Sequence, residues 1–192
     1  MPVNDLKAPS LFPNGDYRLD FEVSAYNVRR AAGVLVSNIL VANSIKCNEY
    51  DRSFAVFAYC YLKPVNRTTK TLSLRVKLLK TPVTEAHAQF TVWKKANGYK
   101  SFVINVTLDI CRYFTGRRNL IFDWFYDIWK QNTNINHTCP YKVRMTDLLV
   151  ENLSLSNFKT LSTFPEGQYR FDFDVGAYCV LRAGVQIFVT VN

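Results

Sequence analysis

The side chains of this sequence with the clearest chemistry are its five cysteines, Cys47, Cys60, Cys111, Cys139 and Cys179. No two of them are close enough in sequence to form the paired motifs that bind zinc, so we expect no metal site. Disulfide formation is the better interpretation. Cys111 and Cys139 flank a segment with helical periodicity, and a bridge between them would tie both ends of that helix to the rest of the fold.

The other cysteines leave alternatives open. Cys47 and Cys60 lie on either side of a polar, turn-like stretch, which is compatible with a bridge across an antiparallel pair of strands. Four cysteines allow three connectivities, and the sequence does not choose between them. For Cys179 we expect a buried free thiol, with an intermolecular disulfide as the alternative.

Imidazole side chains, the usual bases of enzymes, are rare in this chain. His87 and His137 are the only two, and each lies in a polar, loop-like context. No nucleophile motif or metal-binding pair accompanies them. We therefore expect no catalytic residues, no cofactor and no enzymatic activity.

Four N-glycosylation sequons begin at Asn66, Asn105, Asn136 and Asn152, where chance would give about two. Together with the cysteines they favour an oxidising, secretory compartment. The start of the chain nevertheless lacks the charged and then apolar regions of a signal peptide.

The net charge of +9 is concentrated in one region. Between Arg52 and Arg118 there are thirteen Lys and Arg but only two acidic residues, Glu85 and Asp109. Such a field favours anionic partners, among them lipid headgroups, sulfated glycans and nucleic acid, although solvated strand faces would explain the charge equally well. No zinc-finger spacing, recognition helix or RNA-binding signature is present, so we expect no nucleic-acid partner.

One stretch of the chain occurs twice. Residues Phe12 to Arg30 align without a gap to Phe164 to Arg182, with twelve identities in nineteen positions. A solenoid needs several stacked repeats, and one partial copy is not enough. We interpret residues 1–43 as a partial duplicate of the closing strands, an extension or a gene-model fusion, and residues 44–192 as the complete module. The apolar run 31–42 is too short for a bilayer span of about 20 residues and is interpreted as a strand, so we expect no transmembrane segment.

Alternating apolar residues predict several strands. Residues 53–63 are apolar on both sides, which favours a central strand, whereas residues 71–79 have one apolar and one polar face. Asn97-Gly98 suits a tight hairpin turn between strands at 90–94 and 102–108. A last pair of strands is expected at 147–155 and 168–175.

One segment departs from this alternation. From Asn119 to Lys130 apolar residues recur at spacings of three and four, which predicts a helix rich in aromatic residues. Asn119 could cap its start, and Asn132 or Asn134 its end. Short strands and one aromatic helix predict a mainly β fold: an immunoglobulin-like β-sandwich or cup of antiparallel strands.

An aromatic helix over a sheet is either ordinary core or one wall of an apolar ligand site. Such sites are concave and largely hydrophobic. If the site exists, we expect it to be lined by residues of the second hairpin strand and of the helix: Phe102, Ile104, Val106, Leu120, Trp124, Phe125 and Ile128.

The module also resembles a known family. The stretches that carry the resemblance are Ile45–Cys47 with Asp51, Cys60–Thr68, Leu78–Val83, Lys94–Lys100, Asn105–Cys111, Asn134–Tyr141 and Phe164–Tyr169. They are similar to an insect domain family of unknown function that is abundant in flies. That family resembles the ML lipid-recognition proteins and the CheB chemosensory proteins, which are secreted β-sandwich cups related to the ganglioside activator.

The resemblance implies a secreted, disulfide-linked carrier of a lipid or another apolar small molecule, active in chemosensation or reproduction, with a membrane receptor as a further candidate partner. It also implies that Cys47, Cys60, Cys111 and Cys139 are the characteristic cysteines. The alternative is an extracellular interaction module without a cavity, whose basic face binds a receptor, a glycan or an anionic membrane surface.

Overall fold

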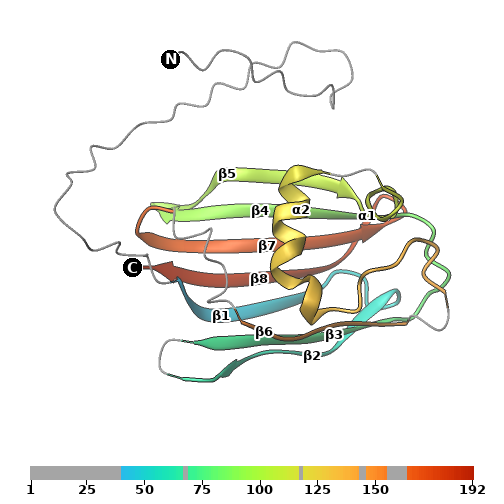
Figure 1. The fold of residues 1–192 in the computed structure, drawn as a ribbon, viewed down its shortest axis with the longest axis horizontal. Helices are drawn as coiled ribbons and strands as arrows, with labels where there is room; N and C mark the ends of the chain where they lie inside the picture. The colour runs from blue at the N-terminus through green and yellow to red at the C-terminus, as the bar shows by residue number, and fades with distance from the viewer. Residues whose placement is uncertain (1–39, 67–68, 117–118, 143–145, 155–163) are drawn as a thin grey trace, which may run out of the picture. The chain divides into compact units, whose positions relative to one another are not determined.

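The computed structural model describes residues 40–66, 69–116, 119–142, 146–154 and 164–192. Their strands form two antiparallel sheets (Figure 1). The five-stranded sheet consists, in spatial order, of β1 (Leu40–Glu49), β8 (Val180–Val191), β7 (Gly167–Ala177), β4 (Ala86–Ala96) and β5 (Gly98–Asp109). The three-stranded sheet consists of β2 (Ala55–Pro64), β3 (Lys70–Leu78) and β6 (Asp147–Ser154). The predicted mainly β, sandwich-like architecture is confirmed.

The main core lies between the two sheets. Alternate residues of each strand point inward, because side chains alternate between the two faces of a sheet. The five-stranded sheet contributes Val92, Tyr169, Phe171, Ile187, Val189 and Val191, and the three-stranded sheet contributes Leu72, Leu74, Val150 and Leu153. Tyr169 is fully buried, and its hydroxyl donates to the carbonyl oxygen of Pro165 at 2.6 Å.

Two tight turns set the hairpins of the five-stranded sheet. The turn at Asn97-Gly98 joins β4 to β5 as predicted, and Gly98 has a φ of 90°, a value that glycine tolerates without a steric cost. Tyr178 and Cys179 join β7 to β8 with φ values of 55° and 60°, as in a type I′ turn. Because Cys179 sits at this turn it is exposed, and the expectation of a buried thiol is wrong.

Strand β2 is not central. It pairs with β3 alone among the described strands and forms an edge of the three-stranded sheet. Its second apolar face is partly exposed, and 45% of the Tyr61 surface is accessible to solvent. Apolar residues on both sides of a strand therefore do not indicate a central position here.

The sheet begins earlier than the predicted module boundary at residue 44. Leu40 pairs with Val191 across β1 and β8, and the side chains of Leu40 and Ala42 are buried in the core. Residues 40–43 therefore belong to the sheet. The remainder of the duplicated segment, residues 1–39, lies outside the described part of the chain.

The predicted helix is present. Helix α2 (Leu120–Trp129) begins at Asn119, whose side-chain oxygen accepts hydrogen bonds from the backbone N–H groups of Ile121 and Phe122. A short helix α1 (Ile110–Phe114) precedes it, and a 3₁₀ turn, η1 (Lys130–Asn132), follows it. None of the helices in the described residues is long and apolar enough to cross a membrane.

The two asparagines expected to end the helix have another role. Asn132 donates to the carbonyl oxygen of Glu151 at 2.9 Å, and Asn134 bonds the backbone of Asp147 and Leu149. They connect the segment after the helix to strand β6. Lys130 itself occupies the end of α2.

Two disulfides connect the layers. Cys47 on β1 is bonded to Cys60 on β2 and so links the two sheets. Cys111 in α1 is bonded to Cys139, which fixes the segment containing α2 at both ends. The predicted pairing of Cys111 with Cys139 is confirmed.

Replacing Cys111 and Cys139 together by serine should lower the free energy of unfolding by about 3 to 4 kcal/mol, because the bridge closes a loop with a sequence separation of 28. Guanidinium unfolding of the purified variant measures the loss. Cys179→Ser is the matched control, and its exposed position should limit the change to about 0.5 kcal/mol. Equal losses in both variants would contradict a structural role for the bridge.

Candidate ligand cavity

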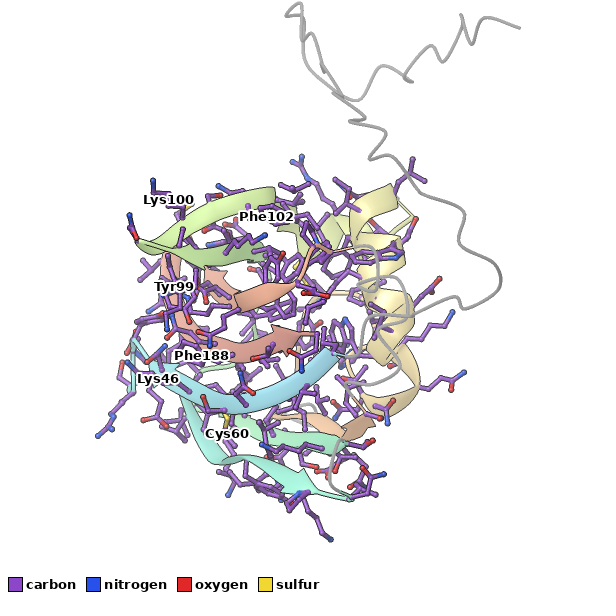
Figure 2. All side chains as sticks on the ribbon, turned by 90° about the vertical axis from the view of Figure 1, so that its left-hand side faces the viewer. Lys46, Cys60, Tyr99, Lys100, Phe102 and Phe188 are labelled. Carbon is purple, nitrogen blue, oxygen red and sulfur yellow. A yellow bond between two sulfur atoms is a disulfide. The ribbon has the colours of Figure 1, made fainter. Side chains whose placement is uncertain are left out.

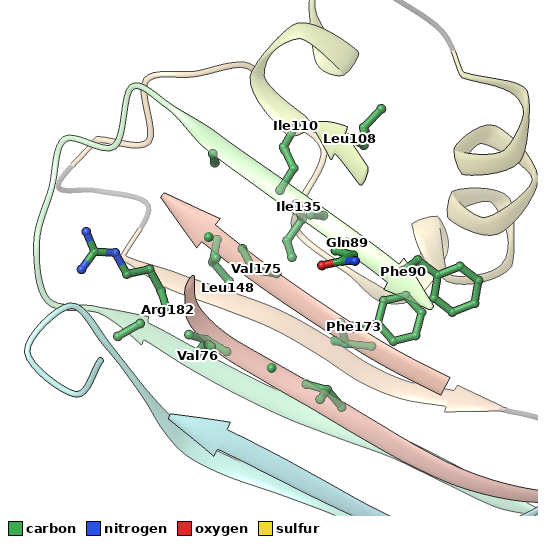
Figure 3. Close-up of a pocket in the computed structure, with 18 of the residues that line it drawn as sticks. Val76, Gln89, Phe90, Leu108, Ile110, Ile135, Leu148, Phe173, Val175 and Arg182 are labelled. Atoms are coloured by element: carbon green, nitrogen blue, oxygen red, sulfur yellow. The ribbon is translucent and has the colours of Figure 1, made fainter. Parts of the chain in front are cut away.

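A cavity of about 230 Å³ lies between the sheets and the helices. The three-stranded sheet contributes one wall, including Leu74, and the five-stranded sheet contributes the facing wall, including Ala88 and Val106. Figure 3 labels further lining residues of the two sheets: Val76, Leu148, Phe90, Phe173 and Val175. The atoms that face it are almost all apolar. The space is thus a hydrophobic hollow lined by elements far apart in the sequence, and it opens to solvent beside Ile121, a lining residue that is 45% exposed.

Three stacked phenylalanine rings form part of its wall. Phe125 of α2 stacks on Phe90 of β4 and on Phe173 of β7, with ring centroids 4.5 Å apart in both pairs. Phe90 and Phe173 stack on each other at 4.6 Å. Phe125 is 5% exposed and is the one buried residue of α2. These contacts attach the helix to the five-stranded sheet.

The helices close a second side of the cavity. Ile110 and Phe114 of α1, and Ile121 and Phe122 of α2, line it. Phe122 also belongs to a ring cluster with Tyr113, whose ring lies edge-on to it at 4.6 Å. The two helices therefore pack on each other through aromatic side chains, and α1 is in addition bonded to Cys139 through Cys111.

Arg182 and Gln89 are among the polar residues of the wall, and both engage their polar groups elsewhere. The Arg182 guanidinium forms an ion pair with Asp51 and lies 4.4 Å from the centre of the Phe54 ring. Figure 3 shows this guanidinium turned away from the apolar side chains of the wall. Gln89 donates its amide N–H to the side-chain oxygen of Asn105 at 3.1 Å.

The ion pair also changes the acidity of Asp51. Hydrogen bonds from Ser53, and secondarily from Arg182, hold the pKa of the Asp51 carboxyl below its usual value. The carboxylate is therefore charged at neutral pH, and the positive charge of Arg182 is neutralised outside the cavity.

Tyr141 and His137 pack together at the margin of the cavity. Tyr141 lines the wall and is 4% exposed, and burial raises the pKa of its phenol to about 12. The His137 ring lies edge-on to it at 4.6 Å. Burial lowers the pKa of His137, and its Nδ1 has no hydrogen-bond partner among the described residues.

The structure brings two of the seven sequence-predicted cavity residues to the wall, Val106 and Phe125. Phe102, Ile104, Trp124 and Ile128 pack against the main core and do not line the cavity. Leu120 is 76% exposed. Strand β5 and helix α2 therefore do contribute to the cavity wall, as predicted, but five of the seven residues predicted within them do not line it.

The reasons are geometric. Phe102 and Ile104 lie nearer the Gly98 end of β5 than Val106 does. The interior is packed there, because the Phe102 ring lies edge-on to the rings of Tyr169 and Phe164, with ring centroids 5.5 and 5.6 Å apart. Leu120 precedes Phe125 by five residues, which places it on the far side of a helix with 3.6 residues per turn. The same helical period would have selected Ile121, Phe122 and Trp129, which line the cavity.

The three-stranded sheet was missing from the predicted site. Its inward residues Leu72, Leu74 and Val76 carry a clear alternation signal, but that signal identifies a buried face and not an unfilled one. Whether a buried face is packed or hollow depends on side chains from the opposite layer.

All four sequon asparagines are exposed: Asn66, Asn105, Asn136 and Asn152. They lie respectively after β2, on β5, after η1 and on β6. A glycan at each position would project into solvent. The described residues contain no group of three or more His, Cys, Asp or Glu side chains that could hold a metal ion.

A cluster of aromatic and cationic side chains occupies the outward face of the five-stranded sheet. The Arg170 guanidinium lies 5.0 Å from the Trp93 ring centre and 4.9 Å from that of Tyr99, and Asp172 accepts two hydrogen bonds from it at 2.8 Å. Tyr99 lies edge-on to Phe188 at 6.2 Å. In Figure 2 Tyr99, Phe188 and Lys46 follow one another across the sheet.

Comparison with known proteins adds one match. A family model described as a protein of unknown function (DUF1091) matches residues 88–171, from β4 to the first part of β7. The matched region contains much of the cavity wall, both helices and the Cys111–Cys139 bridge. No curated protein matches the chain.

The lowered pKa of His137 makes stability depend on pH. Between the folded pKa and the unfolded value of about 6.5 the unfolded chain binds more protons, so the free energy of unfolding should fall as the pH falls through this window. NMR titration of the His137 ring gives the folded pKa. Denaturant unfolding of wild type and His137→Phe across pH 7 to 5 tests the consequence. If the free energy of unfolding depends on pH in the same way in wild type and His137→Phe, burial of His137 has no such effect.

Proposed function

We propose that this chain is a non-enzymatic extracellular carrier that binds a lipid or another apolar small molecule between its two sheets. The cavity of about 230 Å³ is the observation that carries the proposal. Native interiors are normally packed as densely as organic crystals, and an apolar void of this size leaves dispersion contacts unmade. A bound apolar molecule would supply those contacts.

The rest of the structure supports this proposal. Two disulfides are compatible with an extracellular protein, because such bonds persist in oxidising compartments. The exposed sequons fit glycosylation in the same compartment. A role in chemosensation or reproduction, suggested by the resemblance of the sequence to the CheB and ML proteins, is part of the proposal.

A cavity-filling substitution tests the carrier function. Val106→Phe adds bulk at the wall of the cavity, and it should reduce the affinity for octane at least tenfold because the ring occupies space that the ligand needs. Headspace gas chromatography over the purified protein measures the octane withdrawn from the vapour. Val103→Phe is the control, since Val103 lies on the same strand but is 84% exposed. Equal octane affinity of both variants would refute the carrier proposal, because it would place the bound molecule outside this cavity.

A second candidate function rests on the outward cluster of Trp93, Tyr99, Arg170 and Phe188. Aromatic rings beside cations are suited to a sulfated glycan or an anionic membrane surface. Lys46 and Lys95 are exposed near this face and would add to its positive potential.

Charge reversal separates this candidate from the carrier. Lys46→Glu combined with Lys95→Glu should elute from a heparin column at a clearly lower salt concentration than wild type, because two attractive charges become repulsive. Lys63→Glu with Lys77→Glu, on the three-stranded sheet, makes the same change in net charge at exposed positions away from the cluster. Identical elution of both double variants would exclude a specific outward binding face.

A further inference from the structure

The chemistry of the cavity wall limits what it can hold. The atoms that face the cavity are almost all apolar. The guanidinium of Arg182 is bound by Asp51, and its Nε donates to the carbonyl oxygen of Ala177 at 3.3 Å. The amide of Gln89 is bound to Asn105. Neither polar residue offers a hydrogen bond or a counter-charge to a ligand inside.

Two further polar groups on cavity-lining residues do not change this conclusion. The indole N–H of Trp129 has no hydrogen-bond partner within the described residues, but neighbouring atoms cover it, so a ligand cannot reach it without movement of the helix. The phenol of Tyr141 belongs to a residue that is 4% exposed, and almost no polar surface faces the cavity. The wall that a ligand meets is therefore almost entirely carbon.

The size of the cavity sets a second limit. An apolar cavity of about 150 Å³ holds benzene, which has six carbon atoms. By proportion, a cavity of about 230 Å³ holds roughly nine carbon atoms before a wall must move or the ligand must extend into solvent. The ring stack of Phe90, Phe125 and Phe173 and the Cys111–Cys139 bridge oppose such movement of α2.

We propose that the cavity is selective for an uncharged, hydrocarbon-like molecule of about nine carbon atoms that carries no polar head group. This inference rests on the carrier function proposed above. A hydroxyl group inside the cavity loses its hydrogen bonds to water and gains none, and a carboxylate loses more. The cavity thus selects among ligands in two ways: it disfavours polar groups, and its volume limits the length of the hydrocarbon chain.

Three ligand series with the full chain test the proposal: n-alkanes, 1-alkanols and alkanoates of four to twelve carbons at pH 7.4. Headspace gas chromatography measures the first two series, and equilibrium dialysis measures the third. Octane should bind about 10- to 100-fold more tightly than 1-octanol, and octanoate more weakly than 1-octanol. Alkane affinity should rise about fourfold with each methylene up to roughly nine carbons and then level off.

The outcomes separate the two proposals. If octane, 1-octanol and octanoate bind with similar affinity, the head groups remain in water at the mouth and the selectivity proposed here is wrong, although the chain is still a carrier. If alkane affinity continues to rise up to twelve carbons, the proposed length limit is wrong, although the chain is still a carrier. If no member of any series binds, the carrier function itself fails.

A matched pair of variants tests the wall directly. Val106→Thr places a hydroxyl at the cavity wall with little change in volume, and it should narrow the octane to 1-octanol affinity ratio at least threefold. Val103→Thr makes the same change on the solvent side of β5 and should leave the ratio unchanged. Circular dichroism confirms that both variants are folded. An unchanged ratio in a folded Val106→Thr would show that the wall does not select against polar groups.

Discussion

The contact between Phe125 and the five-stranded sheet is the interaction on which the hollow interior depends. Phe125 is the one buried residue of α2, and its ring stacks on rings from β4 and β7. Aromatic pairs of this kind contribute about 0.5 to 1.5 kcal/mol beyond the burial of their area. The stack holds α2 at a fixed height above the sheet. The disulfides fix the two sheets to each other and the helical segment to its surroundings, so the layers do not approach far enough to fill the space.

Charge and hydrophobicity are segregated in this molecule. The cations closest to aromatic rings, Arg182 over Phe54 and Arg170 between Trp93 and Tyr99, each have a carboxylate partner, and none presents its charge to the cavity. The exposed lysines keep a chain with 48% hydrophobic residues surrounded by a positive potential. An apolar interior and a basic exterior are therefore compatible properties of one fold.

Local sequence patterns predicted helix α2, the strands and the turns well. The position of a strand in its sheet and the packing of single side chains depend on long-range contacts, which local patterns do not contain. The Asn97-Gly98 turn, the Asn119 cap and the helix over 120–129 depend on neighbouring residues, and all are present. The edge position of β2 depends on which strands lie beside it. The packing of Phe102 depends on Phe164 and Tyr169, more than sixty residues away, so no periodicity on β5 could separate Phe102 from Val106.

The irregularity of β5 at Val103 has a consequence for how copies of the protein meet. β5 forms an outer edge of the five-stranded sheet, and between Asn105 and Ser101 it spans four residues where β4 spans two. Val103 there has a φ of 58°. Such a bulge kinks the strand and interrupts the even row of donors and acceptors that another chain would need for pairing. This edge is thereby a poor template for amyloid-like stacking, which protects a domain with so many aromatic residues from aggregation.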